Sequence, residues 1–245
     1  VGSEMCIRDR CEPVVMDTRF NSSVTDIFRN EYLSPRSPYT TLQIPKQGIG
    51  EWCHPLHTVD INDAGLRSSV QNGILNTELG IPFRTPAEGH NVAFTSLWDN
   101  YPDSLEIPLK GKASRAYLLM AGSTNHMQCH IDNGVIRIYY KDGTRDVMFL
   151  RNPDNWPPIE HIFFEDGLAF NRHTPALYRL RLKTGEISNN FGEELGFPGA
   201  SRELDGGAAV LLEMPLNPGK KLSHLVLETL SNDVVIGLMS ITLQR

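Results

Sequence analysis

The stretch Val234-Val235-Ile236-Gly237-Leu238-Met239-Ser240-Ile241-Thr242-Leu243 decides the fold class, because apolar residues fill both alternating sets of its positions. A strand with one wet face alternates apolar and polar residues, whereas a strand buried on both faces is apolar almost throughout. Half of the run is β-branched, which also favours a strand. We therefore expect Val234–Leu243 to lie inside a β-sandwich and to mark the C-terminal end of that domain.

Further strands are expected upstream of this run. The clearest pair, Val135–Lys141 and Thr144–Leu150, flanks Asp142-Gly143. Both residue types tolerate the positive φ of a type I′ turn, so the dipeptide predicts a two-residue hairpin. In Tyr178–Lys183, apolar and basic residues alternate, which predicts one core face and one wet face. The other expected strands are Thr40–Ile44, Leu105–Leu109, Ala113–Ala121, Ala208–Met214 and Leu222–Leu230.

The organisation of the whole chain follows from these strands. Connections rich in Pro, Gly and Asn separate them, and no long amphipathic helix interrupts them, so we expect less than about 15% helix. Many short strands predict an all-β fold, a sandwich or jelly roll. Residues 1–10 resemble translated sequencing-adapter read-through and are expected to be a non-native leader. Residues 11–39 are expected to form an irregular extension with a short helix around Val24–Glu31, and residues 40–245 the β-sandwich domain.

Composition and charge argue against several classes of protein. A hydrophobic fraction of 40% supports a sizeable core and therefore disfavours a disordered chain. The net charge is −6 and no basic run occurs, which disfavours binding to the phosphates of nucleic acids. No apolar stretch approaches the roughly 20 residues that cross a bilayer, so no membrane span is expected.

Three parts of the sequence resemble a known family. They are Ile81–Pro86 with Ala93–Pro102, Lys112–Gly122 with the hairpin turn Tyr139–Thr144, and Asp233–Met239. Together they resemble the C-terminal β-sandwich region of an uncharacterised bacterial family, a domain of unknown function that accompanies six-hairpin glycosidase-like regions. The resemblance implies a galactose-binding-like sandwich in a secreted or periplasmic protein of polysaccharide breakdown. It implies an oligosaccharide or polysaccharide and an upstream domain of the same chain as partners, and it supplies no catalytic residue.

Cysteine and histidine residues form two local clusters that could bind zinc. Neither cluster has the ligand spacing of a known zinc motif, so we expect no metal site and no other cofactor. The clusters are Cys53-His54 with His57, and His126 with Cys129-His130. One disulfide could form among Cys11, Cys53 and Cys129, and the sequence leaves the pair unassigned.

Aromatic residues beside carboxylates and amides are the stronger functional signal. An aromatic ring covers the C–H face of a sugar, while Asp and Asn side chains bond its hydroxyl groups. We therefore predict carbohydrate contact by the loop that enters the strand Leu105–Leu109, with two further tryptophans in similar surroundings. The residues concerned are Trp98, Asp99, Asn100, Tyr101, Trp52 and Trp156.

The sequence thus favours an accessory carbohydrate-binding domain, and two alternatives stay open. The tryptophans could plug the ends of the sandwich or pack on an upstream domain, which would make the domain purely structural. The chain could also be a glycosidase domain itself. Exposure of Trp98, Tyr101 or Trp156 in a concave loop region separates sugar binding from packing, and two facing carboxylates in a cleft would indicate an enzyme.

Overall fold

A computed structural model of the chain describes residues 11–30, 60–98, 100–124, 128–163, 171–190 and 201–245. Strands account for 46% and helices for 6% in this structure, so the predictions of an all-β sandwich and of little helix are confirmed. The expected leader at residues 1–10 and the expected strand at Thr40–Ile44 lie outside the described residues. Of the helices described, none is long and apolar enough to cross a membrane.

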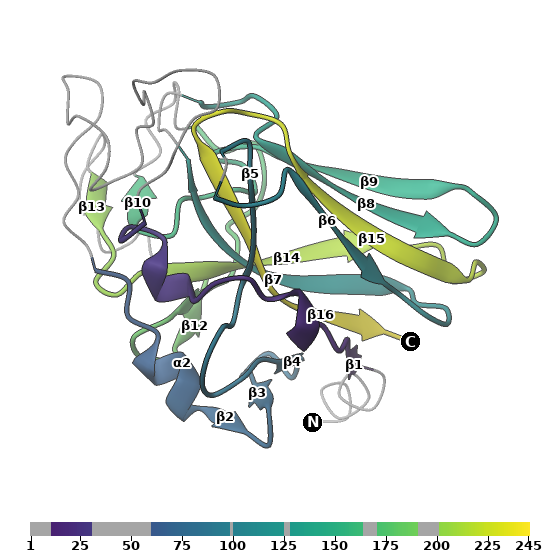
Figure 1. The fold of residues 1–245 in the computed structure, drawn as a ribbon, viewed down its shortest axis with the longest axis horizontal. Helices are drawn as coiled ribbons and strands as arrows, with labels where there is room; N and C mark the ends of the chain where they lie inside the picture. The colour runs from purple at the N-terminus through teal and green to yellow at the C-terminus, as the bar shows by residue number, and fades with distance from the viewer. Residues whose placement is uncertain (1–10, 31–59, 99, 125–127, 164–170, 191–200) are drawn as a thin grey trace.

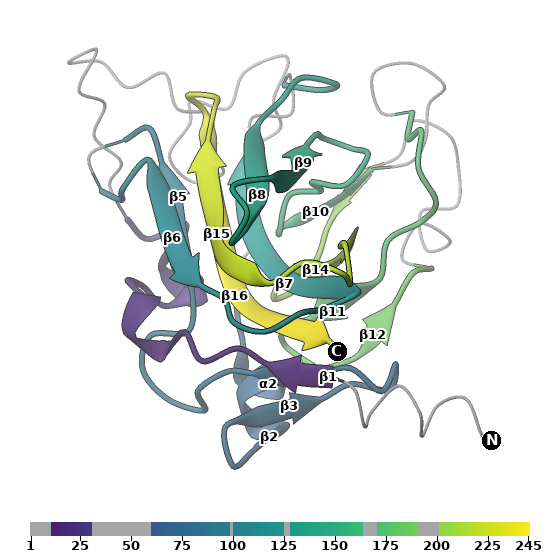
Figure 2. The same ribbon diagram turned by 90° about the vertical axis from the view of Figure 1, so that its right-hand side faces the viewer.

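Two sheets face each other across the main core (Figures 1 and 2). The larger sheet has seven strands in the order β1-β16-β7-β14-β11-β12, with β5 also paired to β16, and the smaller one has four in the order β6-β15-β8-β9. The larger sheet consists of β1 (Cys11–Pro13), β5 (Ala93–Ser96), β7 (Arg115–Thr124), β11 (Arg179–Arg181), β12 (Ile187–Ser188), β14 (Ala208–Pro215) and β16 (Val234–Gln244). The smaller sheet consists of β6 (Ser104–Pro108), β8 (Gly134–Tyr140), β9 (Arg145–Leu150) and β15 (Leu222–Thr229).

Strand β16 is buried on both faces, as its sequence predicts. Its residues Val234, Ile236 and Leu238 belong to the first core, between the two sheets, and Val235 and Met239 belong to a second core on the opposite face. The pairing of β16 with β7 shifts register between Leu238 and Ser240, which makes Met239 an extra residue at a β-bulge. The bulge reverses the alternation, so the residues beyond it that face the first core are Ile241 and Leu243.

The second core lies under a layer built by the N-terminal third of the chain. This layer contains the short helix α2 (Ala64–Ser68) and the small sheet of β2 (Val70–Gln71), β3 (Ile74–Asn76) and β4 (Pro82–Arg84), which Figure 1 shows below the central strands. Helix α2 and strands β2 and β3 lie at the bottom of Figure 2 as well. Two polar residues of β16 face β4: the Ser240 hydroxyl donates to the Arg84 carbonyl at 2.9 Å, and the Thr242 hydroxyl donates to the Pro82 carbonyl.

Residues 11–30 pack onto the sandwich. Strand β1 pairs with the end of β16, and Val24, Ile27 and Phe28 are buried in the second core. Within the expected helix Val24–Glu31, the structure has a 3-10 helix at Val24–Asp26.

The β8–β9 hairpin is confirmed, but the type I′ turn predicted for it is wrong. Among the two central residues only Gly143 takes a positive φ, of 83°, and the chain closes with a hydrogen bond from the Tyr140 N–H to the Thr144 carbonyl. Asp142 instead keeps a negative φ and accepts hydrogen bonds from the backbone N–H and hydroxyl of Thr144. A longer loop with one left-handed glycine results, which is the next most common hairpin connection.

A two-residue turn with positive φ at both central residues occurs instead in the hairpin of β2 and β3. Asn72 and Gly73 take φ angles of 53° and 76° and join β2 to β3 as a two-residue loop. Asn-Gly between strands is the strongest short hairpin signal, so this turn was readable from the sequence.

The strand at Tyr178–Lys183 differs from its predicted pattern at Tyr178 and Arg179. Tyr178 was expected on the core face but is 38% exposed. Leu180 and Leu182 are buried as expected, but Arg179 is buried as well and donates to the carbonyls of His161 and Pro158 at 2.8 and 2.7 Å. Burial lowers the pKa of the Arg179 guanidinium to about 10. The prediction that the basic face of this strand is exposed to solvent throughout is therefore wrong, because backbone carbonyl groups accept hydrogen bonds from the Arg179 guanidinium inside the protein.

Gly237 tests how tightly β16 is packed. A Cβ at this position would collide with the Ala121 carbonyl and lie 2.6 and 2.7 Å from side-chain carbons of Val92 and Phe94. We expect Gly237→Ala to lower the free energy of unfolding by about 3 kcal/mol, because overpacking against paired backbone cannot relax. A melting temperature lower by roughly 6–12 °C should accompany the change. Gly219→Ala, near one side-chain atom only, is the control and should change little; equal effects would contradict the packing described.

Candidate functional site

In the predicted sugar-binding loop, the structure buries Trp98 and leaves Tyr101 partly exposed. Trp98 is only 4% exposed, packs in the second core, and its indole N–H donates to the Asn232 carbonyl. The Tyr101 ring packs on Phe94 with ring centroids 5.1 Å apart. Asn100 is exposed, whereas Asp99 and Trp52 lie outside the described residues. Trp98 therefore offers no exposed ring to a ligand.

Trp156 has a structural place as well. It is 0% exposed within the first core, where two atoms of its indole ring approach the space beside Gly122. The expectation of exposed aromatic platforms at Trp98 and Trp156 is thus corrected. Both indole groups fill core volume, and a sequence that shows polar neighbours cannot show in which direction each ring points.

The described structure instead exposes a mixed aromatic and polar surface on the smaller sheet. We call it the outer face: the side of the β6-β15-β8-β9 sheet turned away from the first core. Alternate residues such as Ile136, Ile138, Leu225 and Leu227 belong to the core, so their neighbours along each strand face outward. Strand pairing aligns the outward residues in three rows, Pro108-His224-Tyr139-Arg145, Glu106-Val226-Arg137-Val147 and Ser104-Glu228-Val135-Phe149. Val135 is buried, so it contributes no exposed area to the third row.

Polar and aromatic groups contact one another along these rows. The rings of Tyr139 and His224 stack with centroids 4.7 Å apart and planes inclined by 13°. Arg145 lies over the Tyr139 ring at 5.7 Å and donates to its hydroxyl at 3.1 Å. In the next rows, Arg137 forms an ion pair with Glu228. These contacts place the aromatic and charged groups side by side on the outer face.

Apolar side chains are exposed at the β9 edge of the same face. Val147 and Phe149 are each 42% exposed, although both are large hydrophobic residues. The Arg151 guanidinium lies 5.7 Å from the centre of the Phe149 ring and bonds to Asp132 at 2.5 Å. The outer face thus combines exposed apolar area with fixed hydrogen-bonding groups.

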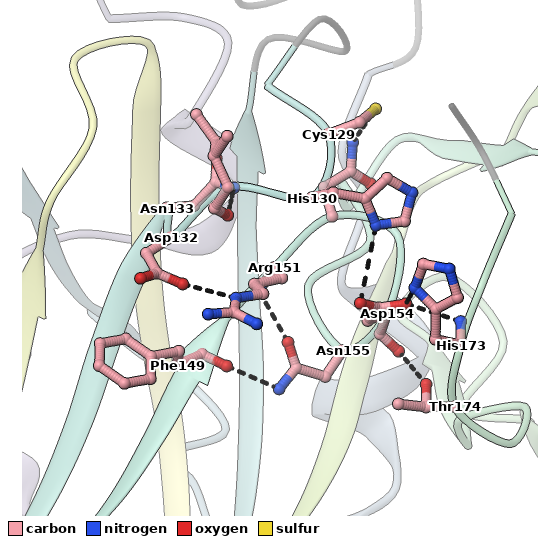
Figure 3. Close-up of polar contacts among 12 residues, drawn as sticks. Cys129, His130, Asp132, Asn133, Phe149, Arg151, Asp154, Asn155, His173 and Thr174 are labelled. Atoms are coloured by element: carbon pink, nitrogen blue, oxygen red, sulfur yellow. Dashed lines mark hydrogen bonds and ion pairs between the residues drawn. The ribbon is translucent and has the colours of Figure 1, made fainter. Parts of the chain in front are cut away.

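A separate cluster of potential metal ligands lies near one end of this sheet (Figure 3). His130, Asp154 and His173 each offer one ligand atom, and these atoms all lie within 4.8 Å of one another. The Nδ1 atoms of the two histidines lie 3.8 and 3.4 Å from the carboxylate oxygens of Asp154. The imidazole rings are 4.8 Å apart between centroids.

Three connections of the sandwich bring this cluster together. The His130 N–H donates to the Asn152 carbonyl at 2.7 Å, which joins the chain before β8 to the chain after β9. Asp154 then accepts a hydrogen bond from the backbone N–H of His173 at 2.7 Å, and its own carbonyl accepts one from the Thr174 hydroxyl at 2.6 Å. The position of the carboxylate is therefore fixed by backbone contacts.

The structure regroups the residues of the predicted zinc clusters. His130 lies with Asp154 and His173, which are distant in sequence and belong to neither cluster. The Cys129 side chain points away from Asp154 (Figure 3), and Cys53, His54, His57 and His126 lie outside the described residues. His130, Asp154 and His173 are 24 and 19 residues apart, which matches no known metal-binding motif. They lie close together only because of how the connections between strands fold.

Two carboxylates are deeply buried in the described part of the chain, and each bonds to polar neighbours. Asp63 accepts hydrogen bonds from Arg67 and Asn91, both at 2.8 Å. Glu160 accepts one from the Ser123 hydroxyl at 3.1 Å. Such contacts are typical of carboxylates that hold a fold together.

No family model matches the chain, and no curated protein is significantly similar to it. The resemblance to the bacterial family therefore stays an expectation.

Substitution of Trp98 tests whether it is a core residue or a sugar-binding residue. We expect Trp98→Ala to lower the free energy of unfolding by about 3–5 kcal/mol, because it leaves a large cavity in the second core. Trp98→Phe should cost less, since it keeps most of the packing and loses one hydrogen bond of about 1 kcal/mol. Urea denaturation measures both. An alanine variant of unchanged stability would show that Trp98 is not a core residue.

Proposed function

We propose that this protein is an accessory carbohydrate-binding β-sandwich, related to galactose-binding-like jelly rolls, from a larger secreted or periplasmic bacterial protein that processes polysaccharides. We further propose that the outer face of the smaller sheet contacts the glycan. The observation that carries the proposal is the alignment of Tyr139, His224, Arg145, Arg137 and Glu228 beside exposed Phe149.

The chemistry of this face suits a sugar. Saccharide rings present C–H groups and hydroxyl groups together, and the outer face presents apolar carbons and charged hydrogen-bonding groups together. Phe149 and Val147 supply the apolar area, while Arg137 and Glu228 supply donors and acceptors. Their mutual ion pair keeps these groups oriented, which lowers the entropy lost on binding.

The expected affinity is weak. Each hydrogen bond to a sugar hydroxyl contributes only about 1 kcal/mol net, because water already bonds both partners. Burial of the apolar ring should contribute more, at about 25 cal/mol per Å² removed from water. Phe149, with the largest exposed ring on the face, is therefore expected to dominate binding.

A second candidate function is packing on an upstream domain of the same protein. It is favoured by Val147 and Phe149, because exposed large apolar side chains at one sheet edge are also suited to a protein interface. The same face would then bind a protein surface, and no glycan would bind to it.

Calorimetry and a glycan array of plant and host polysaccharides test the proposal. We expect Phe149→Ala to weaken binding by about 10-fold, the usual cost of truncating an aromatic contact residue. Tyr139→Ala should weaken it similarly, because it removes the ring that stacks on His224. Tyr178→Ala, which removes an exposed aromatic next to β11 on the other sheet, is the matched control and should bind like the unchanged protein.

Two results would count against the proposal. If no polysaccharide binds to the unchanged protein, the packing function is favoured. If a polysaccharide binds but Phe149→Ala and Tyr139→Ala bind it equally well, the outer face is not the contact surface.

A further inference from the structure

We propose that His130, Asp154 and His173 form a binding site for a divalent transition-metal ion, with Zn²⁺ as the preferred ion. This site is separate from the outer face and does not depend on the proposed carbohydrate function. Its chemistry comes from two imidazole nitrogens and one carboxylate, which are zinc ligands.

The separation of the ligand atoms fits the proposal. Zinc bonds to nitrogen and oxygen are about 2.1 Å long, so two ligand atoms in a tetrahedral site lie about 3.4 Å apart. His173 Nδ1 and Asp154 Oδ1 are already 3.4 Å apart, and His130 Nδ1 and Asp154 Oδ2 are 3.8 Å apart. One ligand atom of each residue lies within 4.8 Å of the other two, so a modest movement of the side chains would bring the three ligands to such separations around one ion.

The three side chains are also available to an ion. The His130 ring makes no hydrogen bond among the described residues: its Nε2 is buried without a partner, and its Nδ1 is too far from Asp154 for one. The Nδ1 atom faces Asp154 without a hydrogen bond to it, so this nitrogen is available to an ion on that side of the ring (Figure 3). The nearby Arg151 guanidinium bonds to Asp132 at 2.5 Å, which leaves the Asp154 carboxylate facing the two histidines (Figure 3).

The surroundings of Asp154 support a built site. Its side chain is only 15% exposed, and its carboxylate accepts the backbone N–H of His173, a contact that orients the ligand from outside. Outer contacts of this kind are characteristic of metal sites, where they hold ligands in position before the ion arrives.

The ligand set selects the class of ion. Calcium and magnesium prefer oxygen ligands, so a site with two imidazoles should discriminate against both. Three protein ligands fill three of the four positions that zinc prefers, and the fourth is open to water or to a donor atom of another molecule. The Cys129 thiol does not complete the set, because it points away from the cluster (Figure 3).

Bound zinc would join three connections of the sandwich. His130 precedes β8, Asp154 follows β9, and His173 precedes β11, so one ion would cross-link chain segments that meet only through loops. An ion that binds the folded state but not the unfolded state raises stability in proportion to the logarithm of its concentration over Kd. The melting temperature of the metal-free protein should therefore rise when zinc is added.

Titration of ZnCl2 into tag-free, chelator-treated protein tests the site, with calorimetry and thermal melting as the two measurements. We expect one strong zinc site per chain and a higher melting temperature with zinc, and no comparable effect of CaCl2. His173→Ala should weaken zinc binding at least about 30-fold, because removing even an outer contact of a metal site costs about 10–100-fold. The His173 side chain is 63% exposed, so its removal should leave the metal-free fold intact.

Two further variants complete the experiment. Asp154→Asn keeps an oxygen that can accept the His173 N–H but loses the charge, and it should also weaken zinc binding. His90→Ala removes an exposed histidine outside the cluster and should bind zinc like the unchanged protein. Absence of a strong zinc site, or equal zinc affinity in His173→Ala, Asp154→Asn and His90→Ala, would overturn the proposal.

Discussion

The burial of both faces of β16 is the constraint on which the rest of the structure depends. One face of this strand closes the core between the two sheets, and the other closes the core beneath the N-terminal layer. Since a single strand serves both cores, a change in its register would expose apolar residues on two sides at once. The bulge at Met239 is part of this arrangement, because it lets Ile241 and Leu243 face the first core while Ser240 and Thr242 bond to β4.

Much of the fold could be predicted from the sequence, for physical reasons that individual elements make clear. Val234–Leu243 is apolar on both sides because both sides are buried, so the run of apolar residues predicts a strand buried on both faces. The β8–β9 hairpin was placed correctly, but its turn type depends on the φ of Asp142, which residue preference alone does not determine. The burial of Arg179 could not be predicted from the sequence. The carbonyl groups that accept hydrogen bonds from its guanidinium come from a distant part of the chain and meet it only in the folded protein.

The candidate sites were predictable to a smaller extent. Aromatic residues beside polar ones predict a sugar-binding loop at Trp98, but the same composition fits a ring that fills a core. Burial decides between the two, because Trp98 is buried. The outer face is assembled by pairing between β15, β8 and β9, so its rows do not exist in the linear sequence. The cluster of His130, Asp154 and His173 depends on loop conformation in the same way.

The antiparallel pairing of β1 with β16 has a mechanical consequence. Cys11, the first residue of β1, lies opposite Gln244, the last residue of β16, so the start of β1 and the end of β16 lie at the same end of one ladder. A pulling force applied through these two ends would load the hydrogen bonds between the strands one after another, as in opening a zipper. Sheared strands resist force with all their bonds at once, whereas this geometry yields at low force. Tension would therefore detach β1, which has three residue pairs with β16, more easily than it would separate β16 from β7, which share ten.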